Sequence, residues 1–280
     1  MSSKRQKDKK VNQYQLSYDA LSFELEAVKE LNRMICKSVN QIKERKRNDL
    51  NRKTRKLNLE SQQRIDAISQ QFMIFLKSKN DSFEFKTEDE VTEILNEYFI
   101  HGLVLPDRFV FFVRTMSLVY LIVEFETFLK EILEATFEKK TEILTSSQKS
   151  LTLEELLSCP DLESAKRRLF YKVASEVVER PITKTFQYLE QTLGIDINGY
   201  NVNLKNFFER VSRRNALVHN QGFADEAYKR ETGRSTRNIN LEVSDRYLNE
   251  TIVLFDSVAN RLYNDLENKF VKKARRIKMQ

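Results

Sequence analysis

The chain has 280 residues with 48 basic and 41 acidic side chains, and its formal net charge is +7. Glycine occurs five times and proline three times, and neither occurs before Gly102. Because sheets and turns depend on these two residues, their scarcity argues against a β-rich fold and predicts an all-α protein of long helices.

Two cysteines, Cys36 and Cys159, and two histidines are too few for a disulfide framework or a four-ligand zinc site. We therefore expect no metal and no cofactor. The N-terminal MSSKRQKDKK lacks the apolar run of a secretory signal. Together with the cysteine count, this favours a cytoplasmic protein.

The positive charge is concentrated in three segments, residues 1–10, 41–60 and 269–280, and the rest of the chain is mildly acidic. Such segments attract polyanions, above all nucleic acid, through counterion release. The plainer alternative is that they are solubilising tails and a solvated helix tip. Composition alone does not decide between these two readings.

The first predicted elements form a helical hairpin. A stripe of apolar residues three or four apart predicts a helix over 21–42, and a shorter stripe predicts a second helix over 65–76. The intervening KERKRNDLNRKTRK is almost free of apolar residues, which predicts a basic, exposed tip. We expect its side chains either to contact RNA or to be merely solvated.

A further helix is expected from about residue 87, and HGLVLPD (101–107) is expected to break it. We place a boundary there, between an N-terminal helical region, 1–100, and a C-terminal helical domain, 101–280. The next helix, 106–140, is apolar nearly all round through its middle, so we expect it to be central. Its apolar run is interrupted by Arg114 and falls short of about 20 residues, so no membrane span is expected.

Four more helices are expected beyond a polar connection. They run from about 161 to 180, from Pro181 to about 194, from about Asn203 through RRNALVHNQG (213–222), and from about 243 to 270. The stretch QGFADEAYKRETGRSTRN (221–238) is expected to be a loop. The last helix carries one apolar stripe, formed by Leu248, Ile252, Phe255, Val258, Leu262 and Leu266.

The RRNALVHNQG helix raises the question of function. A helical projection places Leu204, Phe208, Val211 and Val218 on one predicted core stripe, with Asn215 in its middle. Arg214 and His219 fall on the two shoulders of that stripe. Arg213 points away from it, as a solvated surface residue would.

Histidine exchanges protons near neutral pH, and arginine is a fixed cation whose fork fits phosphate oxygens. RNA carries its own nucleophile, the 2′-hydroxyl. A base that takes its proton and a cation beside the phosphate therefore suffice for cleavage without metal. The ordinary alternative is a helix-end histidine beside a surface arginine, and the spacing alone does not distinguish the two.

The flanking residues are more specific. RNALVHNQG, the following FADEAYKRETG and the final NLEVSDRYLNETIVLFDSVANRLY resemble the HEPN superfamily of all-α proteins, and the helix TMSLVYLIVEFETFLKEIL is similar to its early core helix. The resemblance covers roughly residues 105–270 and leaves the N-terminal hairpin unexplained. Ribonuclease members carry R-x4-6-H, often with Asn, Asp or His after the arginine, which Arg214, Asn215 and His219 match.

The resemblance implies a metal-independent endoribonuclease that yields a 2′,3′-cyclic phosphate, acting as a homodimer with a composite active site. Many members are toxins or phage-defence effectors, so an antitoxin or defence-system partner is a possible companion. The implied catalytic residues are Arg214, Asn215 and His219, and Asn220 and Tyr228 are candidate assistants. One toxin subgroup has tyrosine two residues after the histidine, where this chain has Gln221.

Side chains expected to hold RNA lie in the hairpin tip and the C-terminal tail: Arg45, Lys46, Arg47, Arg52, Lys53, Lys272, Lys273, Arg275 and Arg276. Two other readings stay open. One is a non-catalytic helical module that binds RNA or a nucleotide, or acts as a sensor. The other is a scaffold that assembles through the N-terminal hairpin.

Overall fold

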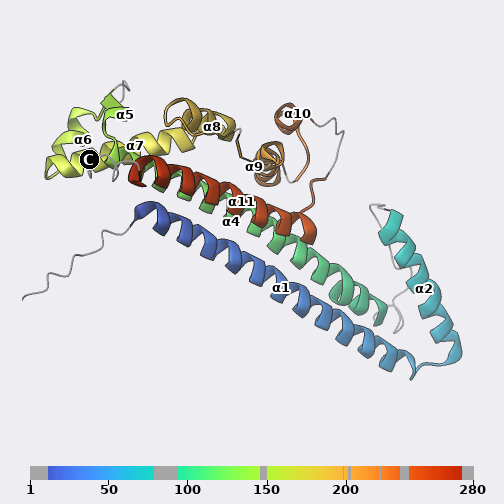
Figure 1. Ribbon diagram of the computed structural model, residues 1–280. Helices are drawn as coiled ribbons and strands as arrows, with labels where there is room; N and C mark the ends of the chain where they lie inside the picture. Colours follow the sequence, from blue (N-terminus) through green and yellow to red (C-terminus); the bar gives the residue numbers. More distant parts are fainter. Residues whose placement is uncertain are drawn as a thin grey trace, which may run out of the picture. The chain divides into compact units, whose positions relative to one another are not determined.

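The computed structural model describes residues 12–78, 94–145, 150–197, 199–200, 203–220, 222–233 and 240–272, and the fold is all-α, as predicted (Figure 1). The described elements are α1 (Gln13–Thr54), α2 (Leu59–Ser78), the π-helix η1 (Glu97–Val104), α4 (Leu105–Lys139), α5 (Glu142–Thr145), α6 (Leu153–Leu157), α7 (Leu162–Val178), α8 (Ile182–Gln191), α9 (Leu204–His219), α10 (Glu226–Thr232), α11 (Asp245–Glu267) and the π-helix η2 (Asn268–Lys272).

Internal contacts divide the chain into two units. One comprises residues 30–114, and the other comprises 1–29 together with 115–280. This division differs from the boundary drawn at residue 100 from the sequence. Helices α1 and α4 each contribute residues to both units, which a boundary based on punctuation residues does not reveal.

The unit of residues 30–114 has a small core of its own, formed by Ile65, Leu95 and Phe99. The hairpin's two helices are present, and most of the basic stretch 43–56 belongs to the end of α1. Helix α1 continues to Thr54, and α2 begins at Leu59 with Asn58 accepting a hydrogen bond from the Ser61 N–H at 2.8 Å. The basic residues therefore lie mostly on the surface of α1.

The expected break at HGLVLPD is wrong, because the backbone stays helical through it. In η1 the Leu105 N–H donates to the Ile100 carbonyl, and α4 follows directly. Pro106 has no N–H to donate, and a wider π-turn ahead of it accommodates that loss. Gly102 is buried there, and a Cβ at this position would lie 3.1 Å from the Lys46 Cβ.

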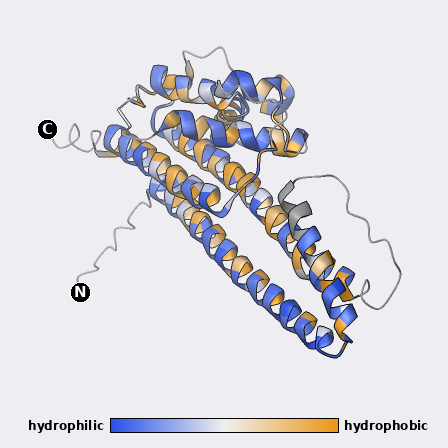
Figure 2. Ribbon diagram, turned by 90° about the vertical axis from the view of Figure 1, so that its right-hand side faces the viewer, coloured by the Kyte–Doolittle hydropathy of each residue, from blue (hydrophilic) through white to orange (hydrophobic). Residues whose placement is uncertain are grey.

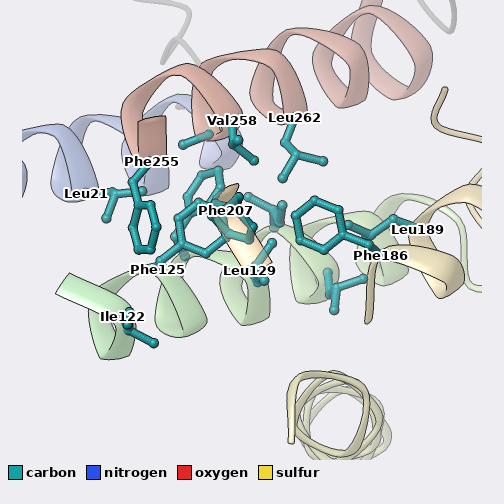
Figure 3. Close-up of a cluster of buried hydrophobic side chains, with 14 of the residues drawn as sticks. Leu21, Ile122, Phe125, Leu129, Phe186, Leu189, Phe207, Phe255, Val258 and Leu262 are labelled. Atoms are coloured by element: carbon teal, nitrogen blue, oxygen red, sulfur yellow. The ribbon is translucent and has the colours of Figure 1, made fainter. Parts of the chain in front are cut away.

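The larger core lies in the unit of residues 1–29 and 115–280, and aromatic rings form its centre (Figure 3). Phe207 on α9 lies 5.0 Å from Phe125 on α4 and 4.9 Å from Phe255 on α11, measured between ring centroids. Phe186 on α8 adds a fourth ring, 5.3 Å from Phe207. The core therefore fixes α9 between α4, α8 and α11.

The predicted stripe of α11 is confirmed. Its six apolar residues from Leu248 to Leu266 are all buried. Hydrophobic and hydrophilic residues are mixed along the helices (Figure 2). Helix α4 has more exposed apolar side chains than its predicted central position implies. Its middle buries Leu118, Leu121, Ile122 and Phe125, but large apolar side chains are exposed on another face, namely Phe109, Phe112, Met116, Tyr120 and Val123. No helix in the described ranges is long and apolar enough to span a membrane.

Three short helices, α5, α6 and α10, occur where a connection or a loop was expected. Thr152 and Glu155 form a capping box at the start of α6. Asp225 caps α10 by accepting from the Tyr228 N–H, and Gly233, with φ of 67°, ends it. Helix α10 therefore lies inside the segment 221–238 that was interpreted as a loop.

Candidate active site on helix α9

Helix α9 begins and ends where the sequence predicts. The Asn203 side chain accepts from the Asn206 N–H at 3.0 Å, and the helix ends at His219, three residues before Gly222, whose φ is +84°. The predicted core stripe is correct only in part, because Leu204, Phe208 and Val211 pack against the larger core but the stripe does not continue to the end of the helix. Leu204, Phe208 and Val211 are only half-buried, and Asn215 and Val218 are exposed.

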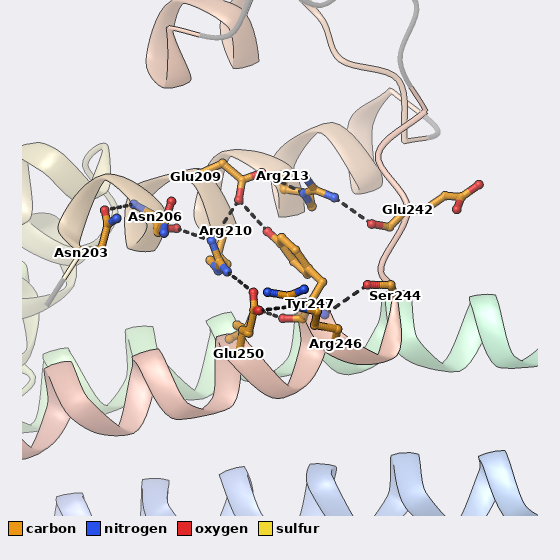
Figure 4. A network of polar contacts seen from close by, with 11 residues as sticks. Asn203, Asn206, Glu209, Arg210, Arg213, Glu242, Ser244, Arg246, Tyr247 and Glu250 are labelled. Carbon is orange, nitrogen blue, oxygen red and sulfur yellow. Dashed lines mark hydrogen bonds and ion pairs between the residues drawn. The ribbon is translucent and has the colours of Figure 1, made fainter.

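In addition to this apolar side, α9 buries a polar side that centres on Glu209 (Figure 4). The Glu209 carboxylate accepts hydrogen bonds from Tyr228 Oη at 2.6 Å, Tyr247 Oη at 2.9 Å and Arg213 Nε at 2.9 Å. Arg210 also lies against it, 3.4 Å away. A polar face can be buried here because most of its groups bond one another, although the buried Arg210 Nε has no hydrogen-bond partner among the described residues.

Arg213 is therefore not the solvated residue that the projection suggested. Its side chain is 11% exposed, and it donates to Glu209 and, at 2.7 Å, to the Glu242 carbonyl (Figure 4). The guanidinium carbon lies 4.1 Å from the centroid of the Tyr247 ring, a cation–π contact. Arg213 thus belongs to a structural network, and its guanidinium is bonded within that network.

Arg214 faces a different neighbour. Its Nη2 donates to Glu126 on α4 in an ion pair, and the two side chains are 20% and 32% exposed. Its buried Nε has no hydrogen-bond partner among the described residues. Burial raises the pKa of the Glu126 carboxyl above its ordinary value, and the charge of Arg214 offsets part of that rise. Much of the hydrogen-bonding capacity of Arg214 therefore remains unused.

A cleft of about 460 Å³ opens beside this ion pair. Arg214 and Asn215 line it from α9, and Glu126 lines it from α4. The rest of its wall comes from Val211, from Glu231 on α10, and from the end of α7 and the start of α8: Val178, Glu179, Arg180, Pro181 and Ile182. Its size is within the range of clefts that bind small organic ligands.

His219 is the last residue of α9 and is exposed. It does not line the cleft, but it follows Asn215 by one helical turn, so the two residues share one face of the helix. His219 makes no hydrogen bond to any part of the chain that the structure describes. Asn220 caps α9 and its amide donates to Asp225 at 2.6 Å, which ties the helix end to α10.

Tyr228 lies apart from this face. It is 2% exposed, and its hydroxyl donates to Glu209 within the buried network. The structure thus brings Arg214 and Asn215 together at one cleft, with His219 a turn further along α9. It places Tyr228 on the opposite, buried side of that helix.

The candidate RNA-binding residues of α1 fall into two groups. Lys46 and Lys53 both donate to Glu97, at 2.8 and 3.0 Å, and these hydrogen bonds, together with the two charges, lower the pKa of Glu97 to about 2. Arg45 and Arg47 are exposed and form no ion pair with any described residue, whereas Arg52 pairs with Asp49 one turn away. Lys273, Arg275, Arg276 and the side chain of Lys272 lie outside the described residues.

Glu126 and Arg180 are two charged residues of the cleft that the motif does not contain. Glu126 precedes its partner Arg214 by 88 residues, and no periodicity reveals such a pair. Arg180 lies next to Pro181 between two predicted helices, a position that indicates a connection and not a site.

In the described part of the chain, no three His, Cys, Asp or Glu side chains are grouped so as to hold a metal ion. No protein-family model, curated protein or solved structure matches this chain.

Proposed function

We propose that this chain is a metal-independent endoribonuclease of the HEPN type, acting on RNA in the cytoplasm. The observation that carries the proposal is the grouping on one face of α9. Arg214 and Asn215 line one cleft, and His219 is exposed one turn further on. A fixed cation, an amide and a proton-transfer group are the chemistry that cleavage by the 2′-hydroxyl requires.

In the proposed reaction, His219 takes the proton of the 2′-hydroxyl as its oxygen attacks the adjacent phosphorus. The bond from phosphorus to the 5′-oxygen then breaks, and that oxygen takes a proton from a second acid. The products are a 2′,3′-cyclic phosphate and a 5′-hydroxyl. Arg214 stabilises the negative charge that gathers on the phosphate oxygens, and Asn215 orients the phosphate or the histidine.

One His219 cannot readily supply both the base and the acid, so we propose a homodimer in which the partner chain's copy supplies the second. Exposed apolar residues beside the motif support this arrangement. Val218 and Phe223 are 52% and 50% exposed, and they flank His219 in sequence. An interface would remove these two apolar side chains from water.

Cleavage in the presence of EDTA tests the proposal. Structured RNA should be cut by the purified chain, and His219→Ala should abolish the cut. Growth arrest on expression, lost with the same substitution, would support a role as a toxin or phage-defence effector, with or without an antitoxin partner. Cleavage that is unchanged in His219→Ala would contradict the proposal.

The ion pair between Arg214 and Glu126 favours one rival function, a non-catalytic module that binds RNA or a nucleotide. An arginine whose charge is offset by a carboxylate stabilises the negative charge of a reacting phosphate less than an unpaired arginine does. Salt-dependent RNA binding without cleavage, and without growth arrest, would identify this alternative.

A further inference from the structure

A second arginine lies on the same cleft as Arg214. Arg180 belongs to the three-residue connection 179–181 between α7 and α8, and it is exposed. It forms no hydrogen bond and no ion pair with any residue in the described ranges. Its backbone is held on both sides, by the end of α7 and by Pro181, whose ring fixes its own φ at −49°. The Arg180 guanidinium is therefore a cation without an ion pair to a described residue, on a short and restrained segment that lines the cleft.

The rest of the lining indicates the ligand. Val178, Ile182 and Val211 provide apolar surface, whereas Glu179 and Glu231 provide hydrogen-bond acceptors. The carboxylates disfavour a free inorganic anion. A nucleotide unit of RNA matches the mixture better, because it presents a phosphate, an apolar base face and donating hydroxyl or amino groups. Bases are read in this way when they are unstacked in a single strand.

We propose that Arg180 binds a second phosphate of the RNA, next to the phosphate that Arg214 contacts, so that the cleft takes single-stranded RNA. The inference rests on the proposed function, because it takes the phosphate at Arg214 as its reference point. It adds a binding residue that the motif does not contain. It also predicts which elements the RNA strand crosses, namely α9 and the connection between α7 and α8.

Equilibrium binding tests this without relying on cleavage. The probe is a fluorescein-labelled single-stranded RNA with 2′-O-methyl groups, which has no attacking hydroxyl. Arg180→Ala should weaken its binding about fivefold at 0.1 M salt and reduce the slope of log K against log salt by about 0.7, the value of one single-strand phosphate contact. Arg180→Lys should retain most of that slope. Lys184→Ala is the matched control, since Lys184 is an exposed cation of α8 that lies outside the cleft.

Arg180 is exposed and forms no hydrogen bond or ion pair with a described residue, and its charge acts only at a distance on Tyr188, so the thermal unfolding of the variant should be close to that of the wild type. Wild-type affinity and salt slope in Arg180→Ala would overturn the inference, and so would an equal loss in Lys184→Ala. A duplex of the same sequence that binds as tightly as the single strand would also overturn it. Cleavage of unmodified RNA is scored separately. If the wild type cleaves RNA but Arg180→Ala binds the probe as the wild type does, only the inference about Arg180 is rejected. If Arg180→Ala weakens binding but the wild type does not cleave RNA, only the proposed nuclease activity is rejected.

Discussion

Arg214 and Glu126 form an ion pair between α9 and α4 in the wall of the cleft, although 88 residues separate them in sequence. The pair holds the arginine in place and also offsets its charge. An RNA phosphate entering the cleft would therefore compete with Glu126 for the same guanidinium. We therefore expect that a change at Glu126 alters the affinity for RNA without removing a residue of the motif.

Replacing Glu126 by glutamine should raise the affinity for single-stranded RNA about fivefold at 0.1 M salt, because Arg214 gains a full uncompensated charge. Fluorescence anisotropy with the 2′-O-methyl probe measures the change. Glu138→Gln is the control, since Glu138 is an exposed residue of the same helix outside this cleft. An unchanged or lower affinity in Glu126→Gln alone would show that Arg214 does not meet the RNA.

The two groups of basic residues on α1 should contribute unequally to RNA binding. Arg45→Ala combined with Arg47→Ala removes two charges that have no described partner, and should reduce the salt slope by about 1.4. Lys46→Ala combined with Lys53→Ala removes cations already paired with Glu97 and should reduce it less. Equal losses in the two double variants would contradict this difference.

The buried Glu209 should be essential for stability. Glu209→Gln leaves Arg213 and Arg210 facing an uncharged group in a buried site, which should lower the free energy of unfolding by about 3–5 kcal/mol. Urea denaturation measures the loss. Glu250→Gln removes a half-exposed partner of Arg210 and should cost less than about 1 kcal/mol. A loss of similar size in both variants would contradict the assigned role of Glu209.

The same carboxylate should make stability depend on acid. Burial opposes the ionised form of Glu209, but Arg213 and the hydroxyls of Tyr228 and Tyr247 outweigh it and lower its pKa below the ordinary 4.5. Because the pKa of Glu209 is lower in the folded state than in the unfolded state, its ionisation stabilises the fold at pH values above 4.5. This stabilisation is lost as the pH falls from 4.5 towards the pKa of the folded state. Between pH 6 and pH 3, the wild type should therefore lose more free energy of unfolding than Glu209→Gln does. Parallel pH profiles would refute this assignment.

The apolar surface beside His219 should mediate dimerisation. Val218→Glu places a charge in the proposed interface and should convert dimer to monomer in sedimentation equilibrium, with loss of cleavage. Val253→Glu is the control, because Val253 on α11 is 66% exposed and lies away from the motif in sequence. A wild-type monomer at micromolar concentration, or an intact Val218→Glu dimer, would rule out the composite site.

Local signals in the sequence were enough to predict the helices that matter most. The stripe from Leu248 to Leu266 predicts α11, and Asn203 and Gly222 mark the two ends of α9. The buried face of α9 could not be predicted in this way. It depends on Glu209 contacting Tyr228 and Tyr247, which follow it by 19 and 38 residues, so that a polar side of the helix is buried as well as the apolar one.

The candidate site was predicted in part for the same reason. Arg214 and Asn215 were chosen from the motif, and the structure places both at one cleft. Glu126 and Arg180 enter that cleft from α4 and from the connection after α7, so only the packing of the helices reveals them. The helical projection predicts a solvated Arg213, which is wrong, but Arg213 lies in the Glu209 network and does not line the cleft.

The central claim is most directly tested by comparing the two histidines of the chain on one RNA. His101 is exposed like His219 but lies in η1, in the other unit, so His101→Ala is a matched control. With EDTA present, we expect the wild type and His101→Ala to release fragments ending in a 2′,3′-cyclic phosphate. We expect His219→Ala to release none while it still binds the 2′-O-methyl probe. Equal cleavage by His219→Ala and the wild type would contradict the account.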